Sequence, residues 1–431
     1  MPKQTYPSYD AICGWNDMLP KRKARPSLEQ DISVDFAVIG AGFTGLAAAR
    51  RLHELDDQAS IAIFEASEVG EGSSGRNSGF TSSEVLPRNA TAESAVAAMR
   101  QTVLMRAALD WLIGLVAGHG IQCELEKPGA IRAAATQAGE AALRNVLEVA
   151  RINGIQHEAL SREDILDRAG TGYYRFGLYI KDTYLLQPAA LVRGLADALP
   201  SQLTLYESTP VQRLERQQNK WILHTPAGLV RAHTVILANN GFIPKLGFLK
   251  SRMATIYTYA AITNPLTPSE QSNLGGSPAW GLLPPHRLGT TSRRIGQDRI
   301  MVRSLYAHEK GIEHSEAAAK LHDRFARRWP NLSHVDFEYV WSGATALTMN
   351  GSPCWGKLDD GLYASGGCNG SGIAKGTMLG FHLADLIMDI GDAHTVPSVM
   401  GNASFMAPEP FRSLGFTLIS AIESRKAGLE M

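Results

Sequence analysis

The chain has 431 residues, and its 42 lysine and arginine side chains balance 42 aspartate and glutamate side chains. A chain of this length suits two domains with a ligand cavity between them, and the zero net charge argues against a nucleic-acid partner. No run of about 18 apolar residues predicts a membrane span. The cysteines are far apart in the sequence and the histidines lack ligand spacing, so we expect a reduced, cytoplasmic protein without a metal site.

The first predicted unit is a strand, a glycine turn and a helix. Residues 34–39 are apolar and β-branched, as in a strand buried on both faces. The following GAGFTG has the GxGxxG spacing and leads into the helix-forming run LAAARRLHEL. Gly40 would allow the tight turn, Gly42 the approach of a pyrophosphate, and Gly45 close packing of helix on strand. Phe43 and Thr44 belong to the same predicted phosphate site.

The next unit indicates which dinucleotide binds. A second predicted strand, ASIAIFE, ends at Glu65, whose carboxylate could accept hydrogen bonds from a ribose and thus favours FAD or NAD over NADP. The glycine- and serine-rich loop after it favours FAD, because its N–H groups and its one cation suit a second phosphate and the flavin edge. An ordinary polar turn is the structural alternative. The candidate cofactor contacts in this unit are Ala66, Ser73, Ser74, Gly75, Arg76, Asn77 and Ser78.

A third unit, residues 203–242, predicts alternating strands that return to the first sheet. It ends in the apolar run TVILA followed by small and polar residues. Val211, Ala238 and Asn239 are therefore candidates for backbone contact with FAD, although each could equally be a core position.

Five blocks in this order resemble the D-amino-acid-oxidase-like (DAO) superfamily of FAD-dependent amine oxidoreductases, from about Val34 to Leu386. The blocks are VIGAGFTGLAAA, Glu65 with GSSGRNSGF, LLQPAALVRGLADAL, VILANNGF and YASGGCNGSGIAKGTMLGFHLADL. The SGRNSG loop and the NGSGxxxGTxxG block resemble a bacterial branch that includes γ-glutamylputrescine oxidases and, more closely, L-pipecolate oxidases. The segments SRRIGQDRIMVRSLY and RSLGFTLISAIESRKAG also resemble the L-pipecolate oxidases.

The resemblance implies an α/β (α+β) two-domain fold of the glutathione-reductase-like type. The FAD domain would comprise residues 33–90, 184–245 and 341–390, and a sheet-containing substrate domain would comprise residues 91–183 and 246–340. Residues 1–32 would form an N-terminal arm and residues 391–431 a C-terminal tail.

The resemblance also places a glycine-rich block beside the flavin, where a helix start could stabilise negative charge on the reduced ring. A packing role for this block is the alternative. Its candidate residues are Gly367, Asn369, Gly370, Ser371, Gly372 and Ile373. In sarcosine oxidases of the superfamily a cysteine in the segment matching WSGATALT anchors the flavin, whereas Thr345 stands here, so we expect noncovalent FAD.

The substrate side offers fewer signals. An amine must lose its proton before its C–H bond is oxidised, and an aromatic cage containing Tyr257 and Tyr259 would favour the neutral form; the same spacing also fits one face of a core strand. A substrate carboxylate would pair with Arg293 or Arg294. The resemblance to sarcosine oxidases adds Lys375.

These observations together predict oxidation of a C–N bond in a cyclic or secondary amino acid, L-pipecolate first, to an imine. Oxygen or a quinone would accept the electrons from the flavin. The alternatives are an oxidase of γ-glutamylputrescine or a similar polyamine derivative, and a flavin-binding subunit of a larger dehydrogenase assembly.

Overall fold

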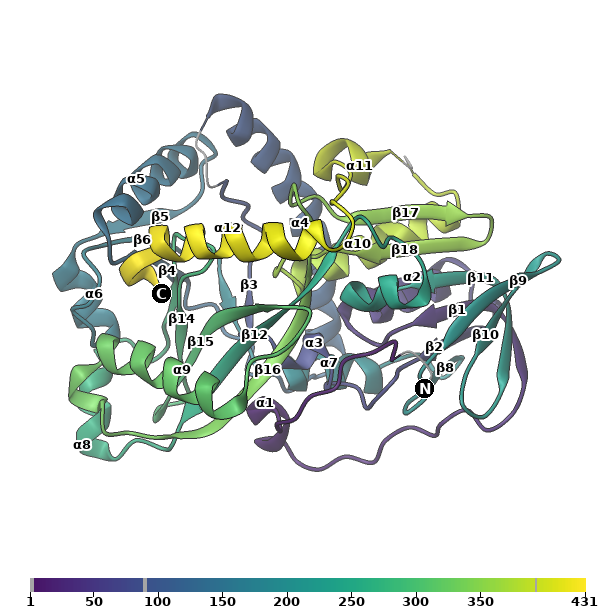
Figure 1. Ribbon diagram of the computed structural model, residues 1–431, viewed down its shortest axis with the longest axis horizontal. Coiled ribbons are helices and arrows are strands. Elements are labelled where there is room, and N and C mark those ends of the chain that lie inside the picture. The colour runs from purple at the N-terminus through teal and green to yellow at the C-terminus, as the bar shows by residue number, and fades with distance from the viewer. Residues whose placement is uncertain (1–3, 88–90, 392–393) are drawn as a thin grey trace.

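The computed structural model describes residues 4–87, 91–391 and 394–431, and in this part of the chain two eight-stranded sheets dominate the molecule (Figure 1). The first sheet has the order β17 (Cys354–Asp359), β18 (Leu362–Gly366), β11 (Leu229–Leu237), β1 (Ile32–Ile39), β2 (Ile61–Phe64) and β8 (Leu203–Tyr206). From β11 it continues into β10 (Lys220–His224) and β9 (Arg213–Gln217).

The centre of the first sheet is the predicted strand, turn and helix. The strand β1 pairs in parallel with β11 on one side and β2 on the other, and its last three residues are buried. Such burial on both faces is expected of a central parallel strand. The helix α2 (Phe43–Leu55) follows the glycine turn. The predicted return of the chain to this sheet is confirmed, since β11 lies directly beside β1.

The second sheet has the order β16 (Phe337–Leu347), β12 (Ala254–Thr263), β15 (Arg299–His308), β14 (Thr291–Ile295), β13 (Gly281–Leu283), β4 (Ala130–Ala134), β6 (Phe176–Ile180) and β5 (His157–Leu160). A short ribbon pairs β3 (Phe80–Thr81) with β7 (Tyr184–Leu185). The third segment of the predicted FAD domain starts at residue 341, and this position lies inside the strand β16 of the second sheet. The two sheets confirm the predicted α/β two-sheet fold.

Helices cover both sheets. On the first sheet, α2 and α10 (Ala374–Ile387) pack together, and a Cβ at Gly380 would overlap the carbonyl oxygen of Thr44. On the second sheet, α9 (His314–Arg328) buries Leu321 and Phe325 against the strands, as its amphipathic pattern predicts. The remaining α-helices are α1 (Gly14–Asp17), α3 (Ser73–Arg76), α4 (Ala92–Gly118), α5 (Gln137–Ile152), α6 (Arg162–Ala169), α7 (Pro188–Asp197), α8 (Pro268–Gln271), α11 (Thr395–Met400) and α12 (Phe411–Ala427). Among the described residues, none of the helices is both long and apolar enough to cross a bilayer.

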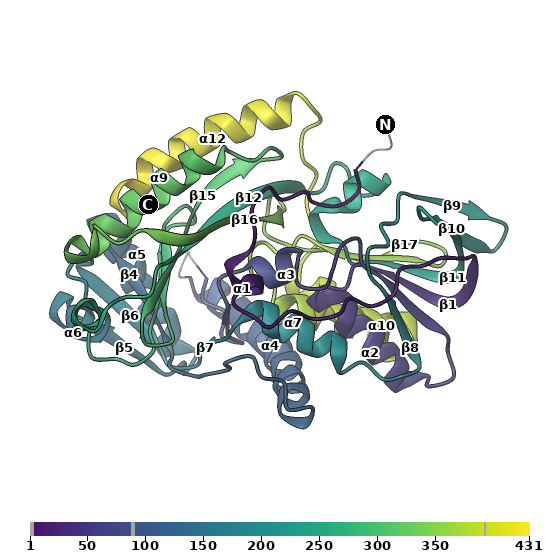
Figure 2. The same ribbon diagram turned by 90° about the horizontal axis from the view of Figure 1, so that it is seen from below.

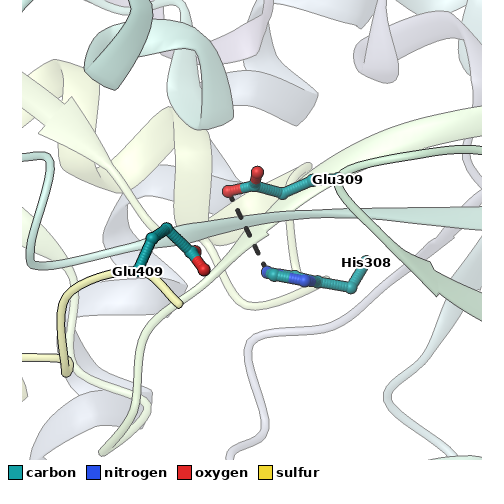
Figure 3. Close-up of side chains that lie close together, drawn as sticks. All are labelled: His308, Glu309 and Glu409. Atoms are coloured by element: carbon teal, nitrogen blue, oxygen red, sulfur yellow. Dashed lines mark ion pairs between the residues drawn. The ribbon is translucent and has the colours of Figure 1, made fainter. Parts of the chain in front are cut away.

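The helix α12 lies across the outside of the molecule, as the two views show (Figures 1 and 2). Its first turn is attached to the end of β15, where His308, Glu309 and Glu409 meet (Figure 3). The His308 ring stacks on Phe416 with centroids 4.5 Å apart. Arg412 pairs with Glu309 at 3.2 Å and with Glu409 at 2.6 Å.

Candidate cofactor and substrate site

Residues of both sheets line a cavity of about 360 Å³. From the first sheet it receives the carboxyl ends of β1, β2, β11 and β18, and from the second sheet it receives side chains of β12 to β16. Ligands of open parallel sheets bind outside the carboxyl ends of the strands. The cavity is therefore the candidate site for both the cofactor and the substrate.

The glycine turn after β1 is shaped for close backbone approach. Gly40 has a φ of +103°, which side chains rarely tolerate. A Cβ at Gly42 would lie 2.7 Å from the Ser74 hydroxyl oxygen, and one at Gly45 would overlap the carbonyl oxygen of Gly40. Gly42 caps α2 without a side-chain hydrogen bond. The Phe43 N–H donates to the Ser74 hydroxyl at 3.2 Å, and the other N–H groups of this helix start remain for a ligand. A phosphate at this helix start would gain those donors and the helix dipole.

Glu65 occupies the end of β2 on the cavity wall. Its carboxylate accepts hydrogen bonds from Ala41 N–H at 2.9 Å and Ser67 N–H at 3.2 Å. Burial raises the pKa of this carboxyl group, while the backbone donors partly oppose that shift. Two N–H donors leave oxygen lone pairs free, so the carboxylate could still accept hydrogen bonds from ribose hydroxyls.

Two buried polar atoms on the cavity wall have no hydrogen-bond partner in the described part of the chain. They are Oδ1 of Asn239, just beyond β11, and Oγ of Ser365, near the end of β18. Unpaired buried polar atoms are costly, so a polar ligand that reaches them is favoured. With the glycine turn and Glu65, these atoms fit a molecule that carries phosphates, a ribose and a ring with polar edges, as FAD does.

A second helix start borders the same cavity. Gly370, Gly372 and Ile373 line it, and Ile373 caps α10 without a side-chain hydrogen bond. Asn369 instead holds the loop, since its side chain accepts from Thr348 N–H at 2.9 Å and donates to the Gly351 carbonyl at 2.9 Å. The arrangement gives the cavity two uncapped helix starts, one from α2 and one from α10.

The predicted cofactor residues divide into two groups by placement. Those that line the cavity are Gly40, Gly42, Phe43, Thr44, Glu65, Ala66, Ser73, Ser74, Arg76, Asn77, Ser78, Val211, Ala238, Asn239, Gly370, Gly372 and Ile373. Those outside its lining are Gly45, Gly75, Gly367, Asn369 and Ser371. Gly45 and Gly75 lie behind the wall, where each lets backbone segments pack closely.

Arg76 lines the cavity but directs its donors to protein oxygens. It donates to the carbonyls of Glu71 at 2.8 Å and Ser342 at 3.0 Å and pairs with the Glu71 carboxylate at 3.1 Å. Its guanidinium also lies 3.8 Å from the centre of the Tyr9 ring. Arg76 thus ties the loop after β2 to β16 and to the N-terminal segment.

Strand alternation decides which residues of β12 reach the cavity. Thr258 and Ala260 line it, whereas Tyr257 and Tyr259 lie on the other face. The Tyr259 hydroxyl accepts from Ile312 N–H at 2.6 Å, near the start of α9. Successive side chains of a strand point to opposite faces. The predicted tyrosines therefore pack beneath α9, and the threonine between them faces the cavity.

The three residues predicted to bind a substrate carboxylate lie outside the cavity lining. Arg293 is buried and donates to the carbonyls of Gly79 at 3.3 Å and Leu186 at 2.7 Å, and burial lowers its pKa to about 10. Arg294 donates to the carbonyls of Ser277 and Gln297. Lys375 lies in the first turn of α10, outside the cavity lining, where burial lowers its pKa.

Arg303 on β15 is the cation that the second sheet presents to the cavity. It lies opposite Ala260 on one neighbouring strand and Thr291 on the other, and both of these line the cavity. Its Nη1 donates to the Tyr306 hydroxyl at 2.6 Å, so its hydrogen-bond partner among the described residues is a hydroxyl and not a carboxylate. Sequence reasoning missed Arg303, although an arginine at an alternating position of an apolar strand was a usable signal.

The N-terminal segment is a second feature that sequence reasoning missed. Thr5, Tyr6 and Pro7 line the cavity, and the Thr5 hydroxyl donates to the Val211 carbonyl at 2.7 Å. The Tyr9 hydroxyl accepts from Ala344 N–H at 3.2 Å, and burial raises the pKa of Tyr9 to about 12. The segment has no periodic pattern, so its aromatic residues were the available signal.

Thr345, which stands where the sarcosine oxidases have their anchoring cysteine, meets a cysteine side chain in the cavity. Thr345 and Cys368 both line it, with Oγ1 and Sγ 3.6 Å apart. Cys354, in contrast, is buried among apolar residues of the first sheet. The thiol beside Thr345 comes from the glycine-rich block, 23 positions away.

Comparison with known proteins agrees with this geometry. The family described as FAD dependent oxidoreductase (DAO) matches residues 35–386. The chain is 25% identical to the probable oxidoreductase OrdL of Rhizobium meliloti (strain 1021) over 92% of this chain and 94% of that protein. It is 24% identical to the γ-glutamylputrescine oxidoreductase of Escherichia coli (strain K12) over 85% and 86% of the two chains.

Among solved structures, glycine oxidase from Geobacillus kaustophilus matches with a TM-score of 0.74 and 20% identity, over 87% of this chain and all of that one. The family match includes residues of every strand of both sheets and most of the cavity lining, except the N-terminal residues Thr5, Tyr6 and Pro7. The chain therefore belongs to the DAO family of FAD-dependent oxidoreductases.

Proposed function

We propose that the protein oxidises the C–N bond of a cyclic or secondary amino acid to an imine, with L-pipecolate as the first substrate to test. FAD would bind noncovalently, and oxygen or a quinone would be the final electron acceptor. In this proposal the FAD domain comprises residues 33–90, 184–245 and 341–390, and the segments between them form the substrate domain.

The observation that carries the proposal is the guanidinium of Arg303. It is half-buried in the cavity wall, and among the described residues it donates to the Tyr306 hydroxyl and not to a carboxylate. Arginine presents a fork that matches a carboxylate, and such charge-assisted pairs are strong. Glu65 is the acidic side chain of the cavity lining, and it lies at the ribose end. A substrate with a carboxylate therefore suits the wall better than one with a second ammonium group.

The chemistry that FAD supplies when bound is acceptance of a hydride equivalent from the carbon next to nitrogen. The protein would orient the substrate and keep its nitrogen neutral. Thr258, Ala260 and Leu283 give the wall beside Arg303 a mostly apolar character. A desolvated amine loses its proton more readily, which frees the lone pair for the imine. Arg303 would fix the carboxylate while the amine lies against the apolar part.

A second candidate substrate is γ-glutamylputrescine. The Escherichia coli relative is named for activity on this compound. Its glutamyl end carries a carboxylate that Arg303 could also bind, and its far amine would then be the group that is oxidised. A third reading, a flavin-binding subunit of a larger assembly, requires no bound small amine.

The experiment is anaerobic reduction of the bound flavin. The yellow protein is mixed with L-pipecolate, L-proline, sarcosine, D-amino acids or γ-glutamylputrescine, and the flavin absorbance is followed. We expect rapid bleaching by L-pipecolate. Bleaching by γ-glutamylputrescine alone would replace the lead substrate with the second candidate. A protein that none of these compounds reduces would favour the assembly subunit.

A further inference from the structure

The outer face of α12 carries a row of exposed apolar side chains. Phe411, Leu414, Leu418, Ile419 and Ile422 are 67%, 65%, 64%, 53% and 43% exposed. With 3.6 residues per turn, these five positions fall on one face of the helix. A surface helix usually turns its apolar face towards the core, and here that face points to solvent.

The inner face of α12 is attached mainly by polar contacts. Near its start, Arg412 pairs with Glu309 and Glu409 and donates to the Lys250 carbonyl at 2.9 Å. Near its end, Glu423 pairs with Arg287 at 3.2 Å. The helix is thus held in one orientation that leaves the apolar row uncovered, and Figure 1 shows it lying across the surface with no described segment over it.

We infer that this row is the interface with a second copy of the chain, in which two α12 helices pack antiparallel about a two-fold axis. Such an interface uses the same patch on both copies. The apolar residues form two rows with a spacing of four, as the ridges of packed helices do. One row is Leu414, Leu418 and Ile422, and the other is Phe411, Gly415 and Ile419.

Gly415 leaves a gap in the apolar surface of α12, and this gap favours another helix as the binding partner. We call this gap the notch. It interrupts the second row, and a Cβ there would meet nothing within 4 Å. Glycine weakens a helix interior, and no neighbour within this chain requires it here. Against a second α12, the notch would receive a large side chain, and the two-fold axis can place Leu418 of the other copy there.

Charge at the two ends of α12 fits an antiparallel pair. Arg425 and Lys426 lie in the last turn, and Glu409 precedes the first. With Gly415 against Leu418, the Arg425 end of one helix lies beside the Glu409 segment of the other. The antiparallel helix dipoles are also favourable. A lipid surface fits less well, since helices that lie on membranes carry cations along their polar face. Here that face has Glu423 and the serines Ser413, Ser420 and Ser424, and its cation Arg412 is already paired with Glu309 and Glu409.

The test is sedimentation velocity of the full, flavin-loaded chain over a range of concentrations. We expect a dimer for the wild type and a monomer for Leu418→Glu, which buries a charge at the centre of the interface. Thr417→Glu is the matched control, because Thr417 is the exposed neighbour on another face of the same turn. It should remain dimeric. Unchanged flavin absorbance and circular dichroism would show that each variant is folded.

Two further variants test the geometry. Gly415→Ala should raise the thermal midpoint of the monomer yet weaken the dimer at least tenfold, because the notch is filled. Arg425→Glu should weaken the dimer, most strongly at low salt. A wild type that stays monomeric at every concentration, or a Leu418→Glu variant that dimerises like Thr417→Glu, would overturn the inference. Wild-type binding to phosphatidylglycerol vesicles that Leu418→Glu abolishes would also overturn it.

Discussion

The proposed substrate class rests on a single guanidinium, that of Arg303. Removing a charged partner of a buried carboxylate typically costs on the order of 2 to 5 kcal/mol, which is about thirty-fold to several thousand-fold in kcat/KM. We therefore expect Arg303→Met to lower kcat/KM on the best amino-acid substrate by a factor in this range. Arg303→Lys should lie between Met and the wild type, since it keeps the charge but loses the fork. The rate of anaerobic flavin reduction is the measurement.

The control for this prediction is Arg294→Met on the neighbouring strand. Arg294 contacts the carbonyls of Ser277 and Gln297, outside the cavity lining, so reduction rates should be unchanged. Piperidine, which is L-pipecolate without its carboxylate, gives a second check. If Arg303→Met slowed reduction by piperidine as much as reduction by L-pipecolate, the arginine would not bind the carboxylate.

At the scale of secondary structure, the contact between α2 and α10 sets the shape of the cofactor cavity. Both helices start at the cavity, and they cross where Gly380 meets Thr44. In Gly380→Ala the new methyl group would overlap the Thr44 carbonyl, and such overpacking typically costs about 1 to 3 kcal/mol. We expect a lower thermal midpoint and weaker retention of FAD, measured by thermal unfolding and by the flavin lost on gel filtration.

The matched control is Gly114→Ala in α4. A Cβ at Gly114 would meet nothing within 4 Å. There the substitution should leave the midpoint unchanged or raise it, because alanine is favoured over glycine by roughly 0.5 to 1 kcal/mol in a helix. Equal midpoints for the two variants would show that the close contact at Thr44 is unimportant.

The attachment of α12 to the second sheet should weaken in acid. Burial lowers the pKa of His308, although Glu309 and Glu409 oppose the shift. A base whose pKa is lowered by folding contributes stability above its unfolded pKa of about 6.5 and loses it as the pH falls. We therefore expect the thermal midpoint of unfolding to decrease as the pH is lowered below about 6.5. In His308→Phe, which keeps a ring against Phe416, the fall should be smaller.

The pH test also has an internal comparison. His334 lies outside the contact with α12 and its side chain is 64% exposed, so His334→Phe is the control for loss of a histidine elsewhere on the surface. Hydrogen exchange in α12, corrected for intrinsic rates, would locate the change. A wild-type profile in His308→Phe would mean that other groups cause the acid lability.

For the whole molecule, FAD bound in the proposed cavity would connect the two sheets. A ligand that binds only the folded state stabilises it by about 4 kcal/mol at a thousand times its Kd. Because strands of both sheets line the cavity, removal of FAD should lower the unfolding temperature of both. Calorimetry of holo and apo protein would show this. Flavin that stays attached to the acid-precipitated chain would contradict noncovalent binding.

The sequence was informative where a local pattern fixes a local structure. The apolar run before Gly40, the glycine spacing and the position of Glu65 predicted β1, α2 and β2 in order. Each of these signals lies within a short stretch of the chain, so it can be recognised without knowing which distant strands pair.

The substrate wall could not be predicted in this way, because it depends on pairing between distant strands. Alternation along β12 shows that Tyr257 and Thr258 point to opposite faces but not which face meets the cavity, since both faces are covered. Arg303 reaches the cavity through its place between β12 and β14, which only the sheet order reveals. Sequence patterns also give no position for Tyr6, which has no regular element around it.

The span of the cavity lining has a consequence for how the enzyme is made. Thr5 and Leu379 both contribute to its wall, so the pocket draws on residues from almost the whole length of the chain. Translation proceeds from the amino end at about 5 to 20 residues per second. The cofactor can therefore meet a complete pocket only after most of the polypeptide has left the ribosome. Flavin supply during expression would then limit the yield of active enzyme more than that of folded chain.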